Sequence, residues 1–308
     1  MHSVNAKTVL EAIHQVEQIF IETNIYCGHG TDNTWDEAVF LVLGACNYPL
    51  TSGDEVAELE IDLVQREQIE AWVKRRAVDR EPLSYISGKA WFGGLEFLCD
   101  RRALVPRSPL AEIIQQYFEP WHTGPLERVL DLCCGGGSLG LLTALGLEEA
   151  RVVLADIDDD ALALAHENAL RLGLSERVEL IKSDVLAGVP QRQFDVVLCN
   201  PPYVDQEDMS ALPPEYLHEP GIALASGADG LDFTRALLVQ LPAFLHDHAT
   251  VFLELGNSWT HFDALFPDYP LTWLEFAQGG WGVCALSKHD IEELARIAAQ
   301  RGIISAHE

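Results

Sequence analysis

The chain of 308 residues has few basic side chains and a large excess of acidic ones. Its 20 lysines and arginines, of which only five are lysines, face 48 aspartates and glutamates, which gives a formal net charge of −28. Proteins that hold nucleic acid non-specifically neutralise its phosphates with clustered Lys and Arg, so this balance disfavours that class. It permits a basic protein partner, although general solubility or adaptation to a salty environment would produce the same charge.

Long apolar runs and a cysteine framework are also missing. No stretch of about 18 apolar residues occurs, so no membrane span is expected, and residues 1–7 lack the apolar core of a signal peptide. The seven cysteines are scattered, and none forms a Cys-x-x-Cys pair. This pattern predicts reduced thiols in the cytoplasm, without a disulfide framework or a metal site. Apolar residues still make up 48% of the chain, enough for one large domain and a smaller one.

The first third of the chain has the periodicity of helices. Apolar residues recur at helical spacing over 3–24, and further helices are predicted over 36–46 and 66–78. Together these segments predict an N-terminal helical domain at residues 1–86. Residues 87–107 contain two strand-like runs around a Gly-Gly pair, which predict a β-hairpin linker.

From residue 108 to residue 308 the pattern alternates between strands and helices. This alternation indicates a mainly parallel sheet with helices on both faces. The last two strands lie too close together for a helical crossover, so they are expected to be antiparallel neighbours. The predicted strands are 128–133, 151–156, 177–181, 194–199, 249–255, 271–276 and 281–287, and the predicted helices are 108–118, 138–147, 159–172, 229–245 and a last one from residue 289.

The most informative motif is Asn200-Pro201-Pro202-Tyr203, which follows the apolar run 194–199. Two consecutive prolines cannot donate backbone hydrogen bonds, so the strand must end there. The resulting corner can hold a planar –NH2 group, because the oxygens of Asn200 and Pro201 accept its two N–H bonds and Tyr203 covers its face. Taken alone, the motif is equally consistent with an ordinary loop after a strand.

A glycine turn after the strand 128–133 indicates a nucleotide site. Gly135, Gly137 and Gly140 satisfy G-x-G-x-x-G, in which the lack of side chains lets a ligand approach the backbone. Asp156 ends the next strand, where its carboxylate can accept both ribose hydroxyl hydrogens. These features fit NAD and S-adenosylmethionine alike.

Three features favour S-adenosylmethionine. Asp131 lies four residues before the first glycine, where it could hold the methionine ammonium through the turn's amides or water. Asp184 follows the third strand, where an adenine edge would lie, although it could instead cap a helix. The antiparallel strands at the end are typical of a methyltransferase sheet, and no dehydrogenase pattern with a catalytic His or a Tyr-x-x-x-Lys accompanies the glycines.

Further segments complete a recognisable pattern. They are Glu81–Ile86, Trp91–Phe97, Leu104–Pro109, His218–Pro220 and Ala225–Leu231. With the glycine turn and the Asn-Pro-Pro-Tyr corner, they make the chain similar to the protein N5-glutamine methyltransferases over most of its length. The branch of that family that acts on peptide-chain release factors usually carries Pro-Arg-Pro-Glu-Thr-Glu. The form found here, Pro106-Arg107-Ser108-Pro109, resembles the branch that methylates the third protein of the large ribosomal subunit.

The resemblance implies a fold and an activity. The fold is the α/β class I S-adenosylmethionine-dependent methyltransferase, a Rossmann-like, mainly parallel seven-stranded sheet with an antiparallel last strand, joined to a small N-terminal helical domain. The activity is transfer of a methyl group to the side-chain amide nitrogen of a glutamine in a basic ribosomal protein, without a metal or a direct need for nucleic acid. The implied catalytic residues are Asn200, Pro201, Pro202 and Tyr203.

The resemblance also extends the expected cofactor site. It places the β-hairpin over the cofactor, which adds Phe92, and the Pro-Arg segment near the pocket, which adds Arg107. Core packing for Phe92 and a surface ion pair for Arg107 are the alternatives, and Glu219 could position a substrate or cap a loop. The full set of expected cofactor-binding residues is Asp131, Gly135, Gly137, Asp156, Asp184, Asn200, Phe92 and Arg107.

Other functions share parts of this pattern. A nucleic-acid amino-methyltransferase would use the same corner on an exocyclic NH2, but the net charge of −28 disfavours it. A release-factor methyltransferase is disfavoured by Arg107-Ser108-Pro109. A non-catalytic nucleotide-binding or assembly protein would have no need for an intact Asn-Pro-Pro-Tyr corner.

Overall fold

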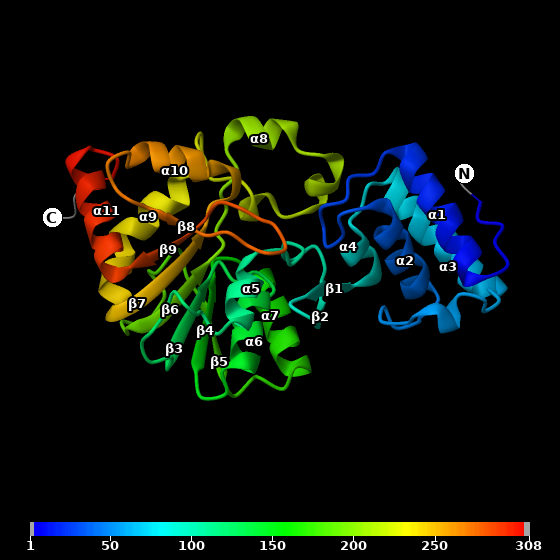
Figure 1. Ribbon diagram of the computed structural model, residues 1–308, viewed down its shortest axis with the longest axis horizontal. Helices are drawn as coiled ribbons and strands as arrows, with labels where there is room; N and C mark the ends of the chain where they lie inside the picture. The colour runs from blue at the N-terminus through cyan, green and yellow to red at the C-terminus, as the bar shows by residue number, and fades with distance from the viewer. Residues whose placement is uncertain (1–2, 305–308) are drawn as a thin grey trace.

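The computed structural model describes residues 3–304. A seven-stranded sheet covered by helices forms one end of the molecule, and a group of N-terminal helices forms the other (Figure 1). The small hairpin β1–β2 lies between the two, and α8 lies beyond the edge of the sheet on the side facing the N-terminal helices. None of the helices within residues 3–304 is long and apolar enough to cross a membrane.

The N-terminal helices fold around a core of their own. They are α1 (Val9–Thr23), α2 (Thr34–Ala45), the short η1 (Asp54–Val56), α3 (Leu63–Val73), the π-helical turn η2 (Lys74–Val78) and α4 (Leu83–Ser87). A capping box between Asp62 and Gln65 fixes the start of α3. Apolar side chains at helical spacing, such as Val16 and Phe20, are fully buried against Leu41 of α2 and its neighbours. The three helices predicted from periodicity are therefore present, but the first begins at Val9 instead of residue 3, and the third changes from α3 to the π-helical η2 after Val73.

The predicted hairpin is also confirmed. Strands β1 (Lys89–Phe92) and β2 (Leu95–Leu98) pair antiparallel. Gly93 and Gly94 join them with φ values of +57° and +82°, the left-handed backbone that a two-residue hairpin turn requires.

The main sheet has the strand order β5-β4-β3-β6-β7-β9-β8. The first five strands of that order are parallel, and β9 runs antiparallel to both of its neighbours, which confirms the predicted fold class. The strands are β3 (Arg128–Leu132), β4 (Arg151–Asp156), β5 (Val178–Lys182), β6 (Phe194–Cys199), β7 (Leu245–Glu254), β8 (Thr272–Trp273) and β9 (Val283–Ser287).

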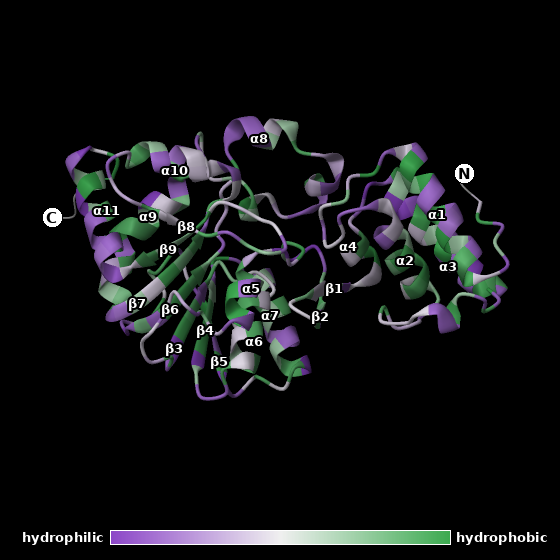
Figure 2. Cartoon of the chain, viewed as in Figure 1, coloured by the Kyte–Doolittle hydropathy of each residue, from purple (hydrophilic) through white to green (hydrophobic). Residues whose placement is uncertain are grey.

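Helices cover both faces of the sheet, and Figure 2 shows the strands as predominantly apolar between helices with polar outer surfaces. Alternate residues of a strand point to opposite faces, so Leu130 packs into the core shared with α9 and α11, whereas Val129 packs into the core shared with α5, α6 and α7. The helices are α5 (Leu110–Gln115), α6 (Ser138–Gly146), α7 (Asp159–Arg171), α8 (Gln206–Ala211), α9 (Asp232–Gln240), α10 (Trp259–Leu265) and α11 (Lys288–Gln300), with short turns η3 (Pro214–His218), η4 (Gly221–Ala223), η5 (Leu241–Phe244) and η6 (Gly256–Ser258).

Two predicted helix ends are wrong. The helix expected over 229–245 ends as α9 at Gln240, because Pro242 cannot continue it; strand β7 then begins at Leu245. The helix expected over 108–118 is shorter as well, because Tyr117 and Phe118 have positive φ.

Candidate active site

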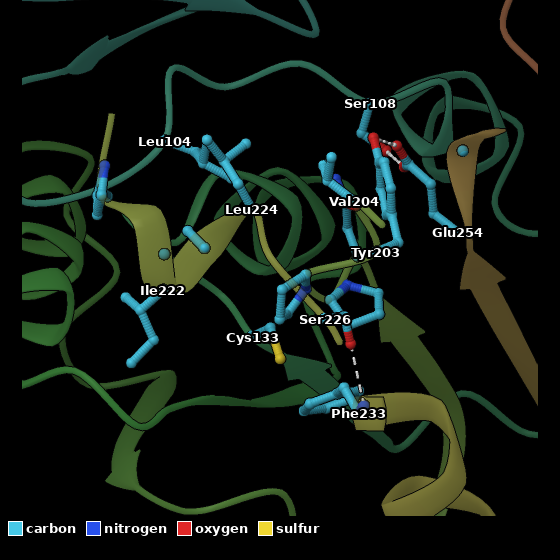
Figure 3. A pocket seen from close by; sticks show the side chains of 18 of the residues that line it. Leu104, Ser108, Cys133, Tyr203, Val204, Ile222, Leu224, Ser226, Phe233 and Glu254 are labelled. Carbon is cyan, nitrogen blue, oxygen red and sulfur yellow. Dashed lines mark hydrogen bonds between the residues drawn. The ribbon is translucent and has the colours of Figure 1, made fainter. Parts of the chain in front are cut away.

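A cavity of about 810 Å³ opens at the carboxyl edge of the parallel strands (Figure 3). This is the edge at which ligands bind in open α/β sheets. Most of its lining comes from residues 102–109, 132–136, 156–158, 183–185, 200–204 and 222–227, with Glu254 and Asn257.

The cavity brings together most of the residues singled out in the sequence. Those that line it are Arg107, Gly135, Asp156, Asp184, Asn200, Pro201, Pro202 and Tyr203. Asp131, Gly137 and Phe92 are not among the lining residues.

Strand register sets the spacing between the two ends of the site. Leu132 of β3 pairs with Ala155 on one side and Cys199 on the other, so the next residues, Asp156 and Asn200, stand two strands apart in one row. Two strand spacings amount to roughly 10 Å. The register therefore separates Asp156, expected to bind the ribose, from Asn200, expected to hold an amide. This separation is about the length of a nucleoside with its attached side chain.

Asp156 lies at the end of the cavity that is expected to bind the nucleoside. Its two carboxylate oxygens accept the backbone N–H groups of Gly135 at 2.8 Å and Asp158 at 3.0 Å. Each oxygen retains a lone pair, so the carboxylate can also accept ribose hydroxyls. Burial raises the pKa of Asp156 above its ordinary value. Gly135 has a φ of +53°, which favours glycine, and a side chain there would project toward Ala103 of the cavity wall.

Asp131 lies behind the glycine turn, almost completely buried. Its Oδ2 accepts the N–H of Gly140 at 2.8 Å, while its Oδ1 has no partner within residues 3–304. Burial, with a contribution from the charge of Asp156, raises the pKa of Asp131 to about 7. Because Asp131 does not line the cavity, its charge can act on an ammonium group bound there only through the glycine turn in front of it.

Asp184 follows the end of β5 and is exposed at the cavity wall. A turn, and not a helix, follows it, so the structure gives no helix for it to cap.

Phe92 and Gly137 serve the packing around the site. Phe92 is 7% exposed and packs edge-on against Phe97. Asn168 of α7 bonds both backbone groups of Leu98 and the carbonyl of Gly136, which holds the hairpin against the back of the glycine turn. The segment after the hairpin, residues 102–109, reaches the cavity instead.

Close backbone packing fixes the Asn-Pro-Pro-Tyr corner. The corner begins directly after Cys199, the last residue of the fully buried β6. The Oγ of Ser258 donates to the carbonyl oxygen of Tyr203 at 2.7 Å. A Cβ added at Gly230 would lie 2.2 Å from the same oxygen, and one at Gly256 would lie 2.4 Å from the Tyr203 ring. Only glycine leaves room for the corner at these two positions.

Glu254 is a site residue that sequence reasoning missed. It ends β7 and lines the cavity, where Figure 3 shows it directed at Ser108 and beside Tyr203. Its carboxylate accepts the hydroxyls of Ser108 at 2.5 Å and Tyr203 at 3.4 Å. Burial raises the pKa of Glu254 to about 7. The available signal was an acidic residue at the carboxyl end of a predicted apolar strand, as at Asp156.

Arg107 of the cavity wall, whose side chain is partly exposed, forms an ion pair with the buried Glu219. The guanidinium donates two 2.6 Å hydrogen bonds to the Glu219 carboxylate and lies 5.1 Å from the centre of the Tyr216 ring. Burial alone would raise the pKa of Glu219, but the neighbouring His29 ring and the Arg107 guanidinium lower it to about 2. Glu219 also accepts the N–H of Val105, so it holds the segment 102–109 in place.

The arrangement therefore combines two capacities in one cavity. One end offers a carboxylate and a glycine turn that fit the ribose and amino acid parts of S-adenosylmethionine. The other offers an amide oxygen, bare carbonyls and an aromatic ring that fit a planar amide.

Comparison with known families agrees with this geometry. The family model described as "Methyltransferase small domain" matches residues 114–227. A ribosomal protein uL3 glutamine methyltransferase from Bordetella pertussis is 40% identical over 86% of this chain and 89% of its own length. Proteins of the same name from Francisella tularensis and Xylella fastidiosa are each 39% identical, over 93% and 96% of this chain and 92% and 96% of their own lengths.

Solved structures share the fold at lower identity. The hMettl16 catalytic domain in complex with MAT2A 3'UTR hairpin 1 has a TM-score of 0.51 and 18% sequence identity, and the match covers 81% of this chain and 91% of that one. At this identity the similarity concerns the fold alone.

Proposed function

The chain belongs to the family of ribosomal protein uL3 glutamine methyltransferases, and from that premise we propose that it methylates the side-chain amide nitrogen of a glutamine in ribosomal protein uL3. S-adenosylmethionine is the methyl donor of this activity. The observation that carries the proposal is the single cavity in which Asp156 and the Asn200 corner stand two strands apart.

The chemical difficulty of the reaction is the weak nucleophile. An amide nitrogen shares its lone pair with the carbonyl, so it attacks poorly. When bound, S-adenosylmethionine supplies a methyl group on a positively charged sulfur, and the carbon–sulfur bond breaks as the new carbon–nitrogen bond forms. The protein's part is to orient the nitrogen and raise its electron density.

Asn200 and Pro201 perform that part in our proposal. The Asn200 side-chain oxygen and the Pro201 carbonyl accept the two N–H bonds of the substrate amide, which aims the nitrogen and makes it more electron-rich. Tyr203 covers the amide plane. Glu254 stands beside Asn200, at the end of the neighbouring strand β7. Its carboxylate form can accept the proton that the methylated nitrogen releases.

We further propose that the N-terminal helices, within residues 1–86, select the protein substrate. The net charge of −28 supports a basic substrate. A ribosomal protein substrate and seven unpaired cysteines fit a cytoplasmic enzyme.

Transfer of a labelled methyl group tests the proposed function. The purified protein is incubated with labelled S-adenosylmethionine and, in parallel, with uL3, a peptide-chain release factor and ribosomal RNA. We expect label on one glutamine side chain of uL3, located by tandem mass spectrometry. Label confined to the release factor or the RNA would overturn the assignment.

A further inference from the structure

A second cavity, of about 560 Å³, is lined by both the N-terminal helices and the β-hairpin. Aromatic side chains form much of its wall: Phe40, Tyr48, Trp72 and Trp91. The proposed methyl transfer does not use this cavity. Partly exposed aromatic rings around a recess are typical of surfaces that bind another molecule.

Two side chains in this wall have unsatisfied polar atoms. His29 is only 5% exposed, and neither of its ring nitrogens has a hydrogen-bond partner within residues 3–304; its Nε2 lies 3.5 Å from the nearest Glu219 oxygen. The Nε1 of Trp91 is likewise buried without a partner. Buried donors and acceptors without partners cost free energy, and a bound polar group removes that cost.

The second cavity adjoins the reaction cavity. Val105 and Pro106 line both. The His29 ring also packs against the ring of Tyr216, 4.5 Å between centres, and Tyr216 lines the reaction cavity. The two cavities therefore adjoin at Val105 and Pro106, so a polypeptide that enters the reaction cavity can also contact the second one.

The charges of the wall favour a polypeptide over nucleic acid. Lys89 is the cavity's one lysine or arginine among the described lining residues, and it pairs with Glu96 at 3.1 Å. Glu37 is committed to Arg76 and Thr31. No lysine or arginine among the described residues of this wall is left unpaired for a phosphate, whereas a peptide unit carries both a donor and an acceptor for the polar atoms of the wall.

We propose that this second cavity binds a segment of the polypeptide substrate that flanks the target glutamine. The inference rests on the proposed function. Trp91 donates to a main-chain carbonyl of the segment, His29 bonds the adjoining peptide unit, and the aromatic wall packs against one of its side chains. The cavity thus reads the sequence beside the glutamine, while the reaction cavity holds the glutamine itself.

Site-specific cross-linking tests the location. A photoreactive benzoylphenylalanine replaces Thr51, an exposed residue that lines the second cavity, and, as the control, Glu148, an exposed residue that lines neither cavity. With uL3 and S-adenosylhomocysteine present, we expect the Thr51 position to capture uL3 within about ten residues of the methylated glutamine, a reach set by the extended chain. Absence of a cross-link, or the same pattern from Glu148, would overturn the inference.

Kinetics tests the contact. Trp91→Phe removes the indole N–H and keeps an aromatic ring, and Trp121→Phe, at a position outside both cavities, is the matched control. We expect Trp91→Phe to raise the KM for uL3 roughly five- to tenfold, the effect of one lost hydrogen bond, with kcat and the Kd for S-adenosylmethionine unchanged. A KM equal to that of the control contradicts the proposal.

A second variant and the wild-type protein distinguish the possible outcomes. If Trp91→Phe fails to fold, Thr51→Trp places a bulky ring at the exposed rim of the cavity, and the same rise in KM is expected. A wild-type protein that does not methylate uL3 contradicts the proposed function. A wild-type protein that methylates uL3 but shows neither the cross-link nor the KM change contradicts only the second cavity's role.

Discussion

Asn200 and Glu254 occupy equivalent places at the ends of neighbouring strands, and their chemistry differs. Cys199 pairs with Leu253, so the residues that follow them stand side by side at the rim of the cavity. Asn200 offers a neutral amide whose oxygen accepts hydrogen bonds, which in the proposed mechanism orients a substrate NH2 without taking up a proton. Glu254 is a buried carboxyl whose pKa is raised to about 7 by burial. Orientation and proton uptake can therefore be separated by substitution at single positions.

Asn200→Ala and Asp156→Ala are expected to give reciprocal results. In the proposed mechanism Asn200→Ala removes the oxygen that holds the substrate amide, so we expect turnover to be lost while the affinity for S-adenosylmethionine stays within a few-fold. Asp156→Ala removes charged hydrogen bonds to the ribose, which weakens cofactor binding by roughly 1.5–3 kcal/mol. Calorimetric titration beside a methylation assay measures both. Wild-type turnover in the first variant, or unchanged affinity in the second, would exclude the assigned role.

Glu254→Gln is expected to change how stability depends on pH. The pKa of Glu254 rises from its ordinary 4.5 to about 7 on folding, so the folded state keeps a proton that the unfolded chain has lost across this window. The stability this provides is fully present below pH 4.5 and is lost as the pH rises through 7. The loss amounts to roughly 3 kcal/mol, and the glutamine variant lacks it.

Denaturant unfolding of both proteins at a series of pH values checks this expectation. Asp131, whose pKa is also raised to about 7 by burial and by Asp156, contributes to both proteins equally, so their difference isolates Glu254. Parallel curves between pH 4 and pH 8 would show that Glu254 titrates normally.

At the scale of elements, the reactive corner depends on how closely other segments approach it. Tyr203 is held between Gly230, in the turn before α9, and Gly256, at the start of η6. The segment after the corner also pairs with residues 224–226 through the N–H and carbonyl of Val204. The geometry of the corner is thus fixed by two other segments, the loop between η4 and α9 and the turn after β7.

Gly256→Ala tests this dependence, with Gly279→Ala as its control. Both glycines have positive φ, +46° and +82°, but an added Cβ meets the Tyr203 ring at 2.4 Å in the first and nothing within 4 Å in the second. The left-handed backbone at these positions destabilises both alanine variants by about 1–2 kcal/mol. Only Gly256→Ala is expected to displace Tyr203 and lower kcat, by at least about tenfold given how sharply misplacement reduces rates. Equal kcat values in the two variants would contradict the argument.

Over the whole molecule, a buried ion-pair cluster joins the N-terminal helices to the catalytic end. Glu215, in η3, accepts hydrogen bonds from Arg76 at 3.2 Å, Arg80 at 3.3 Å and the N–H of Tyr26 at 2.9 Å. Arg76 and Glu215 are almost completely buried. The cluster therefore fixes the N-terminal helices to the loop that leads away from the Asn200 corner.

Glu215→Ala is expected to destabilise the protein strongly. It leaves a buried guanidinium only partly compensated by Glu37, a change that typically costs about 3–5 kcal/mol. The matched control, Glu293→Ala, removes an exposed ion pair with Arg296, and solvent-exposed pairs of this kind contribute little to stability. Thermal unfolding of the three proteins gives the comparison. A Glu215 variant as stable as the control would mean that the two ends are held together by other contacts.

Much of this arrangement follows from the sequence, and the exceptions have physical causes. Strand periodicity and the double proline predicted the sheet and the position of Asn200, because burial on both faces and the missing N–H groups are local properties. Phe92 illustrates the limit, since its surroundings depend on how the hairpin is placed, and Asn168, which holds the hairpin through Leu98, is 70 positions beyond Leu98 in the chain. For Glu254 the sequence offers a signal, an acidic residue at the end of a predicted strand, but not its contacts with Ser108 and Tyr203, which are 146 and 51 positions away. His29 offers no such signal, because its neighbours Glu219 and Tyr216 lie far along the chain.

A crystal structure with S-adenosylhomocysteine and a glutamine-containing peptide of uL3 would test the reaction site most directly. We expect the ribose at Asp156 and the glutamine side-chain nitrogen within hydrogen-bonding distance of the Asn200 oxygen and the Pro201 carbonyl, facing the sulfur. A glutamine bound elsewhere, or a corner closed off from the nucleoside, would contradict the mechanism.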